Sequence, residues 1–170
     1  MSDTERWSVL SYSTEETIAL GEVLGGLLQA GDVVGLLGDL GAGKTHFVRG
    51  VGQGMLVDAR YPVSSPTFTL INEHPGREML VHVDLYRLEE IDEMIEVGLF
   101  DYLGGRGVCL VEWFDRLRGE EPAERLELTL EVVDDDCRCL HGRAFGERHG
   151  DLLHRWRRGW QEAGECESPI

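Results

Sequence analysis

The fold is decided by the stretch Gly38-Asp39-Leu40-Gly41-Ala42-Gly43-Lys44-Thr45, which fits the phosphate-binding pattern G-x-x-x-x-G-K-[ST] at every fixed position. Glycine adopts backbone conformations that other residues avoid, so the chain can approach a ligand closely and point successive N–H groups at phosphate oxygens. In this pattern Lys44 reaches the β- and γ-phosphates of a nucleotide, and the Thr45 hydroxyl binds Mg²⁺. The stretch therefore predicts a site for a nucleotide and its magnesium ion.

The residues around this loop follow the order strand, loop, helix that such a site requires. Residues 33–37 form a short apolar run, typical of a buried parallel strand. Residues 46–51 can continue as a helix whose positive N-terminal end faces the same phosphates. Lys44 is also the only lysine in the chain, whereas arginine occurs fifteen times. The alternative is a glycine-rich turn that carries a solvated lysine, and the context disfavours it.

Length and composition indicate one domain. A chain of 170 residues with 42% hydrophobic content can bury a core, so we expect a P-loop domain over residues 1–160 and a flexible tail over residues 161–170. No apolar run approaches the length of a membrane span, and the polar N-terminus lacks a secretory signal. We therefore expect a cytoplasmic protein with no membrane partner. The formal charge of −16 disfavours tight unaided binding to nucleic acid, which depends on Lys and Arg.

The cysteines leave one alternative open. Cys137, Cys139 and His141 alternate, so on a strand they share one face and suggest a metal site. Their spacing is not that of a zinc knuckle, and no fourth ligand is evident. Ordinary strand residues are the favoured interpretation.

The apolar pattern predicts an α/β fold of three layers, in which helices flank a central mixed, mostly parallel sheet. Strands are expected over residues 7–12, 33–37, 79–84, 108–112, 126–132 and 138–144, the last two antiparallel. The first helix is expected to begin with a capping box at residues 13–16 and to end at Gly31. A second helix should follow the phosphate loop and end at the glycines 52 and 54. Further helices are expected over residues 88–96, 98–103 and 147–160. Residues 63–71 begin with small polar residues around Pro66, which predicts a mobile loop that leads into a strand.

Two carboxylates follow buried strands, where a phosphate loop needs an acid to hold Mg²⁺ or its water. Glu112 is the expected metal ligand, and Asp84 is expected nearer the γ-phosphate, although the two roles can be exchanged. The guanine motif N-K-x-D is impossible, because the only lysine is Lys44 and the only asparagine is Asn72. ATP is therefore the expected nucleotide.

Several blocks taken together resemble the TsaE (YjeE) ATPases of bacteria. Besides the loop, these blocks are S-P-T-F-T-L at 65–70, H-V-D-L-Y-R-L at 82–88, G-L at 98–99 with D-Y at 101–102, and V-E-W at 111–113. The resemblance covers roughly residues 10–145 and implies a small P-loop α/β fold. It implies a role in forming threonylcarbamoyladenosine beside the tRNA anticodon, without transfer of the threonylcarbamoyl group itself. The partner would be the TsaB–TsaD heterodimer, reset by ATP hydrolysis, and tRNA would be contacted only through that complex.

The resemblance also implies roles for single residues. Residues that contact the nucleotide would be those of the loop, namely Gly38, Asp39, Leu40, Gly41, Ala42, Gly43, Lys44 and Thr45, together with Ser13, Asp115 and Arg138. Thr45 and Glu112 would hold Mg²⁺, and Lys44, Asp84 and Thr67, the last in a switch-like loop, would act in catalysis. His46 departs from the family, because many members have a second threonine there. Trp113 is either a core aromatic residue or a stacking partner for the base.

Two other functions remain open at this stage. A P-loop small-molecule kinase would need a lid with arginines, for which Arg116 and Arg118 are candidates, but no insertion of that length is visible. A nucleotide-gated binding module with negligible catalysis is the third possibility, and it differs from the first only in turnover.

Overall fold

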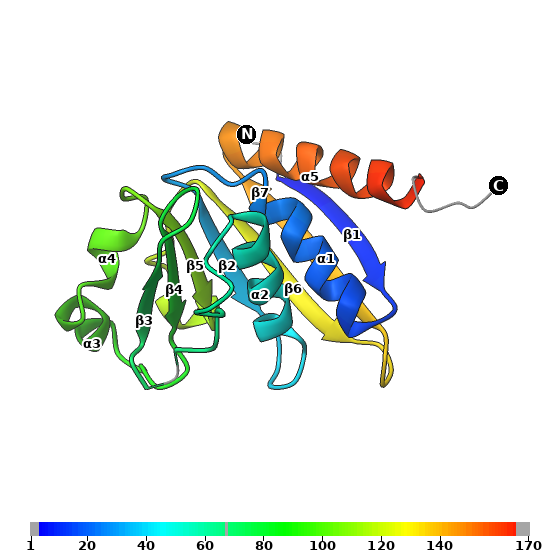
Figure 1. Ribbon diagram of the computed structural model, residues 1–170. Helices are drawn as coiled ribbons and strands as arrows, with labels where there is room; N and C mark the ends of the chain where they lie inside the picture. Colours follow the sequence, from blue (N-terminus) through cyan, green and yellow to red (C-terminus); the bar gives the residue numbers. More distant parts are fainter. Residues whose placement is uncertain (1–3, 67, 166–170) are drawn as a thin grey trace.

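The computed structural model describes residues 4–66 and 68–165, and a mixed β-sheet forms its centre (Figure 1). The strands described lie in the order β1-β7-β6-β2-β5-β4-β3. Their bounds are β1 (Glu5–Ser11), β2 (Val33–Leu37), β3 (Ile71–His74), β4 (Leu80–Asp84), β5 (Val108–Glu112), β6 (Arg125–Val132) and β7 (Arg138–Phe145). The predicted α/β fold with a mixed sheet and antiparallel C-terminal strands is confirmed.

Parallel and antiparallel pairings are equal in number, however, so the sheet is not mostly parallel. The central pairs β2–β6, β2–β5 and β4–β5 are parallel. The outer pairs β1–β7, β6–β7 and β3–β4 are antiparallel. The sheet has more antiparallel pairs than predicted because the strands at its two edges both pair in that way. The N-terminal strand β1 pairs with β7 at one edge, and β3 pairs with β4 at the other.

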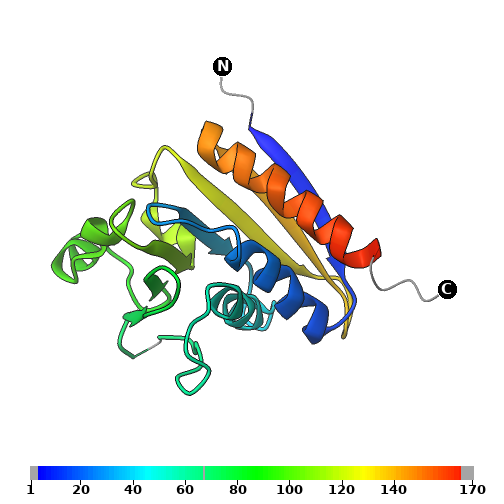
Figure 2. The same ribbon diagram turned by 45° about the horizontal axis from the view of Figure 1, so that its top comes forward.

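Helices cover both faces of the sheet, which confirms the three layers (Figures 1 and 2). One face carries α1 (Thr14–Gly25), α2 (Lys44–Gly54) and α5 (Glu147–Glu165), which share a core with the sheet. The other face carries the short elements α3 (Ile91–Glu96), α4 (Leu99–Tyr102) and the 3₁₀ helix η1 (Phe114–Leu117), around a second core. Because β2 lies between these two cores, almost all of it is buried, as its continuous apolar run predicts.

The helices α1 and α2 touch along their backbones. The sequence predicts that Gly52 and Gly54 end the second helix; α2 continues through Gly52 and ends at Gly54. A Cβ atom at Gly50 would collide with the carbonyl oxygen of Ile18, and one at Gly54 with that of Glu22. The facing helix has the same arrangement, at Gly21 against the carbonyl of Phe47 and at Gly25 against that of Val51. Close packing therefore offsets the low helix propensity of these glycines.

Two helix ends also differ from the prediction. Ser13 is the N-cap of α1, and its hydroxyl accepts from the Glu16 amide at 3.1 Å. The Glu16 carboxylate accepts from the Tyr12 amide at 2.8 Å, one residue before the amide that a capping box would use. The helix α1 ends at Gly25 rather than at Gly31.

The last helix, α5, runs to Glu165 instead of 160, so residues 161–165 are helical and residues 166–170 of the expected tail lie outside the described residues. It is held to α1 by Trp156, whose indole N–H donates to the Leu20 carbonyl at 2.9 Å. Among the helices of the described residues, none has both the length and the apolar character needed to cross a membrane.

Candidate nucleotide site

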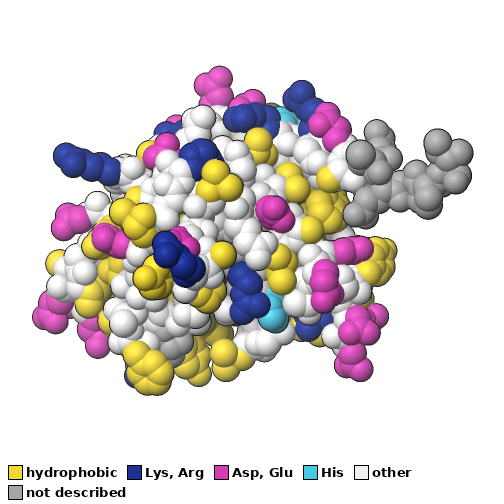
Figure 3. Space-filling model, in the orientation of Figure 1, with side chains coloured by type: hydrophobic (Ala, Val, Ile, Leu, Met, Phe, Trp, Pro, Cys, Tyr) yellow, Lys and Arg dark blue, Asp and Glu magenta, His cyan; other side chains and the backbone are white. Residues whose placement is uncertain are grey.

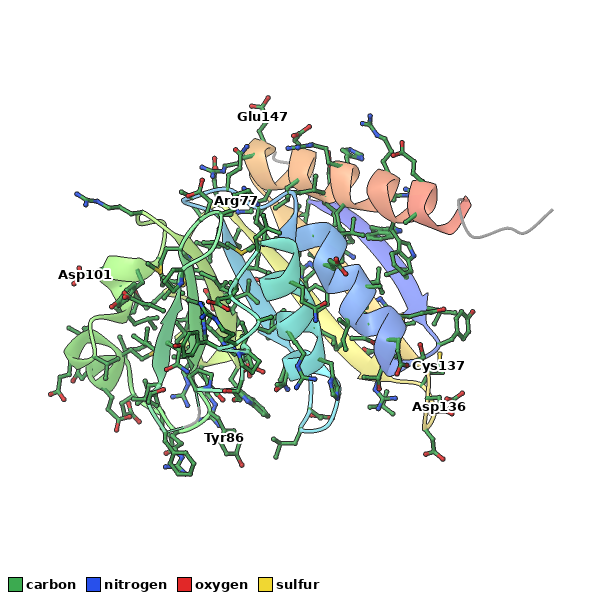
Figure 4. The ribbon with its side chains drawn as sticks, viewed as in Figure 1. Arg77, Tyr86, Asp101, Asp136, Cys137 and Glu147 are labelled. Atoms are coloured by element: carbon green, nitrogen blue, oxygen red, sulfur yellow. The ribbon has the colours of Figure 1, made fainter. Side chains whose placement is uncertain are left out.

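A cleft of about 380 Å³ opens at the carboxyl edge of the central strands. The phosphate loop forms its floor, and its walls come from the start of α1, the ends of β4 and β5 and the turn between β6 and β7. Figure 4 shows Tyr86, after β4, and Asp136, in the β6–β7 turn, on opposite sides of this edge. Ligands of open α/β sheets bind at this edge, outside the carboxyl ends of the parallel strands.

Most of the predicted site residues meet in this cleft. Those that line it are Ser13, Leu40, Gly41, Ala42, Gly43, Lys44, Thr45, Asp84, Glu112 and Arg138. Gly38 and Asp39 do not line it, but their carbonyl oxygens accept hydrogen bonds from Lys44. Asp115 lies in η1 outside the lining, and its charge still acts on Lys44. Thr67 lies outside the described residues.

The loop takes its shape from glycines with positive φ angles. Gly38, Gly41 and Gly43 have φ of 136°, 80° and 101°. A Cβ atom at Gly38 would lie 2.5 Å from the carbonyl oxygen of Leu130, so this glycine is required by space as well as by conformation. At Gly41, apart from its two chain neighbours, no atom of the described residues lies within 4 Å of such a Cβ, so only its conformation requires glycine. Because Gly43 is the N-cap of α2, no side chain competes for the first N–H groups of that helix.

The single lysine is held inside the loop. Lys44 is 6% exposed, and its ammonium donates to the carbonyl oxygens of Gly38 and Asp39, the latter at 2.9 Å. The ammonium also lies 4.4 Å from the ring centre of Trp113. Burial lowers the pKa of Lys44, and the negative charges of nearby carboxylates oppose that shift, in the order Glu112, Asp39, Asp84 and Asp115.

The acid at the end of β4, Asp84, is held on both carboxylate oxygens. Asp84 is 5% exposed, and its Oδ2 accepts from the Ser65 hydroxyl at 2.8 Å. Its Oδ1 accepts from the Tyr86 amide at 2.9 Å. Ser65 belongs to the S-P-T-F-T-L segment, so Asp84 connects that segment to the cleft.

The acid at the end of β5, Glu112, lies beside Asp84. Glu112 and Asp84 are directly paired in the register of β4 and β5, which confirms that the two strand ends coincide. Glu112 is 3% exposed, and its Oε2 lies 2.9 Å from Nε2 of His82, a completely buried residue on β4. Sequence reasoning missed His82, although it stands two residues before Asp84 and therefore on the same face of the strand.

An aromatic side chain covers the lysine. Trp113 has a positive φ of 58°, lines the cleft, and packs against Tyr86 with ring centres 5.1 Å apart. The backbone conformation at this residue turns the chain from β5 into η1, so the indole points back over the phosphate loop. Trp113 is thus half-buried at the edge of the site rather than inside the core.

Other lining residues were not predicted as contacts. These are Thr14, Thr17, His46, Ser65, Tyr86, Asp135 and Asp136, while Trp113, offered above as one of two alternatives, lines the cleft as well. Thr17 is one helical turn after the N-cap Ser13, a spacing that indicates the same side of α1. The aspartates come from the β6–β7 turn, whose position depends on the sheet order and has no local signal. The lining described includes one arginine, Arg138, and neither Arg116 nor Arg118 of the kinase alternative is part of it.

Comparisons with known proteins found a family model, relatives and a solved structure that resemble this chain. A family model described as threonylcarbamoyl adenosine biosynthesis protein TsaE matches residues 11–140. The chain is 42% identical over 140 residues to a protein of Bacillus subtilis named tRNA threonylcarbamoyladenosine biosynthesis protein TsaE, covering 82% of this chain and 86% of the relative. A protein of the same name from Treponema pallidum is 39% identical over 126 residues, covering 74% and 92%. The crystal structure of Bacillus subtilis YdiB superimposes with a TM-score of 0.79 at 33% identity, covering 93% of this chain and 98% of that one.

Proposed function

The chain belongs to the TsaE family, and from this premise we propose that it binds and hydrolyses Mg²⁺-ATP as an accessory protein in the formation of threonylcarbamoyladenosine in tRNA. One observation carries the proposal. A phosphate loop with the only lysine of the chain faces two buried carboxylates at adjacent strand ends, Asp84 and Glu112. This is the set of groups that phosphoryl transfer requires, because its catalysis depends mainly on positioning and on charge stabilisation.

The residues present fit a magnesium nucleotide. The loop glycines leave room for phosphate oxygens, and Lys44 is a cation beside that space. Thr45 and Glu112 supply the hydroxyl and carboxylate oxygens that Mg²⁺ prefers. Asp84 would orient the attacking water, while Ser13 and Arg138 would contact the outer parts of the nucleotide. When bound, Mg²⁺ neutralises charge that develops on the phosphates during hydrolysis.

Lys44 would change partners when the nucleotide binds. Its ammonium now donates to two backbone carbonyls of the loop, and phosphate oxygens are stronger acceptors for a charged donor. The buried position also keeps water from competing with that contact. Lys44 therefore acts as a positioned charge, and its contacts to the loop maintain its place until a phosphate arrives.

A partner would complete the site, and we propose the TsaB–TsaD heterodimer for that role. The exposed apolar side chains of Leu40 and Tyr86 line the cleft, and Phe68, in the S-P-T-F-T-L segment, is 85% exposed. Figure 3 shows hydrophobic side chains gathered along the lower left edge of the molecule, which suits a protein partner. The formal charge of −16 disfavours direct binding to tRNA and therefore supports contact with tRNA only through that complex. We propose that this takes place in the cytoplasm.

Steady-state ATPase measurements test the proposal. The protein alone should release phosphate slowly, the heterodimer should accelerate release, and Lys44→Ala should abolish the accelerated rate without unfolding the protein. Thr67→Ala should reduce the acceleration if the S-P-T-F-T-L segment responds to the partner. Full activity of the protein alone, unchanged by the heterodimer, would contradict the accessory role. Transfer of phosphate to an added small-molecule acceptor, in place of water, would favour the kinase alternative.

A further inference from the structure

A buried histidine lies directly behind the acid expected to hold the metal. His82, on β4, is 0% exposed, and its Nε2 is 2.9 Å from Oε2 of Glu112 at the end of β5. The two side chains are 30 residues apart in sequence and meet because β4 and β5 are adjacent parallel strands (Figure 1). Both are almost free of solvent, so water does not weaken the contact between them.

Packing alone does not account for a histidine at this position. Alternation along β4 places Leu80, His82 and Asp84 on the same face of the sheet, the face covered by α1 and α2. Leu110, the residue paired with His82 on β5, is a buried member of the core on that face. An aliphatic side chain would fill this position without burying a polar group, whereas burying an imidazole costs desolvation free energy.

The hydrogen bond defines what the imidazole does. A carboxylate that binds a metal ion is ionised and accepts hydrogen bonds, so in that role of Glu112 the ring of His82 would donate the hydrogen bond through Nε2–H to Oε2. The other ring nitrogen, Nδ1, is buried and has no hydrogen-bond partner among the described residues. The polar contact of the ring is therefore directed at Oε2 of Glu112, and no described residue donates to the second oxygen, Oε1.

We propose that His82 is a positioning residue, which holds one oxygen of Glu112 so that the other is presented to Mg²⁺ in the cleft. This inference rests on the proposed function, because it assigns a role toward the same metal ion. A glutamate side chain has several rotamers, and a fixed one binds a metal with less loss of entropy. Groups that orient metal ligands in this way typically change metal affinity by about 10- to 100-fold.

Two substitutions at His82 and one control separate positioning from packing. His82→Leu removes the donor, whereas His82→Gln keeps an N–H that can reach a carboxylate. His74→Leu is the control, since His74 lies on the neighbouring strand β3, is partly buried, and also has a ring nitrogen without a partner among the described residues. For each purified protein, the affinity for a fluorescent ADP analogue is measured in EDTA and across a Mg²⁺ titration.

The expected result is a change in Mg²⁺ dependence alone. His82→Leu should bind the analogue in EDTA as the wild type does, while the Mg²⁺ concentration for half-maximal effect rises about 10- to 100-fold. His82→Gln should recover most of that loss, and His74→Leu should match the wild type. In ¹⁵N NMR spectra of the wild type without nucleotide, the His82 ring should carry its proton on Nε2.

Several results would overturn the inference. They are an unchanged Mg²⁺ dependence in folded His82→Leu, a His82→Gln variant as impaired as His82→Leu, or a ring protonated on Nδ1 only. If His82→Leu does not fold, the Gln variant decides, because a normal Mg²⁺ dependence supports the inference and an impaired one overturns it. A wild type without any Mg²⁺-dependent nucleotide binding would overturn the proposed function and this inference with it. A wild type that binds nucleotide in a Mg²⁺-dependent way, together with an unchanged dependence in His82→Leu, would overturn this inference alone.

Discussion

Replacing one glycine at the contact between α1 and α2 should destabilise the protein strongly. Gly50 lies in the interior of α2, where alanine is ordinarily preferred by about 1 kcal/mol. Here its added methyl group would overlap the Ile18 carbonyl oxygen and lie 3.1 Å from the Glu22 amide nitrogen. Both are backbone atoms of α1, so neither can rotate away as a side chain would. The helices must separate, and the core between them must open.

The net magnitude follows from two opposing contributions. Overpacking of a close contact costs about 1–3 kcal/mol, and a collision with backbone belongs at the upper end of that range. Subtracting the gain in helix propensity of about 1 kcal/mol leaves a net loss of about 2 kcal/mol for Gly50→Ala. For a domain of this length, that loss corresponds to a decrease in Tm of about 4–8 °C.

Gly164→Ala is the matched control, because Gly164 also lies in a helix but, apart from that helix's own backbone, no atom of the described residues lies within 4 Å of its added Cβ. That variant should be as stable as the wild type, or more stable by up to about 1 kcal/mol. Thermal and urea unfolding followed by circular dichroism measure both variants. If Gly50→Ala were as stable as Gly164→Ala, the backbone contact between the two helices would be wrong.

Three further predictions concern charged groups. Burial lowers the pKa of Lys44, the only lysine side chain, so an amine-reactive reagent should label it at lower pH than a lysine in a model peptide. Mg²⁺-ATP should protect Lys44 from this labelling. Equal labelling with and without nucleotide would contradict the phosphate contact. Glu112→Gln should raise the Mg²⁺ requirement of nucleotide binding more than Asp84→Asn, and the reverse order in a Mg²⁺ titration would exchange their roles. Burial also lowers the pKa of His149, whose ring accepts a hydrogen bond from the Val33 amide. The imidazole therefore binds a proton more readily in the unfolded chain than in the folded protein. The free energy of unfolding should then fall as the pH drops below about 6.5. In urea titrations at pH 7 and pH 5 that decrease should be smaller for His149→Gln, and an equal decrease would rule out this cause.

Local spacing was enough to predict a glycine loop at residues 38–45 with a strand before it and a helix after it. The glycines, the lysine and the threonine are contiguous, so covalent geometry keeps them together whatever the rest of the chain does. Asp84 and Glu112 could be placed at strand ends because each follows an apolar run, and parallel strands present those ends at one edge. The family was also evident at this level, since its signature blocks are short and local.

The tertiary structure alone decided which distant segments meet. A period of two shows which residues of a strand share a face, but it does not name the neighbouring strand, so the contact between His82 and Glu112 had no sequence signal. The pairing of β1 with β7 is likewise long-range, and it made the sheet equally parallel and antiparallel. Asp136 reached the cleft because β6, the strand before its turn, pairs with β2, the strand before the glycine loop. Intrinsic propensity also gave no reason for α2 to continue through Gly52, whereas packing against α1, whose backbone leaves no room for a side chain at Gly50 or Gly54, holds the helix as far as Gly54.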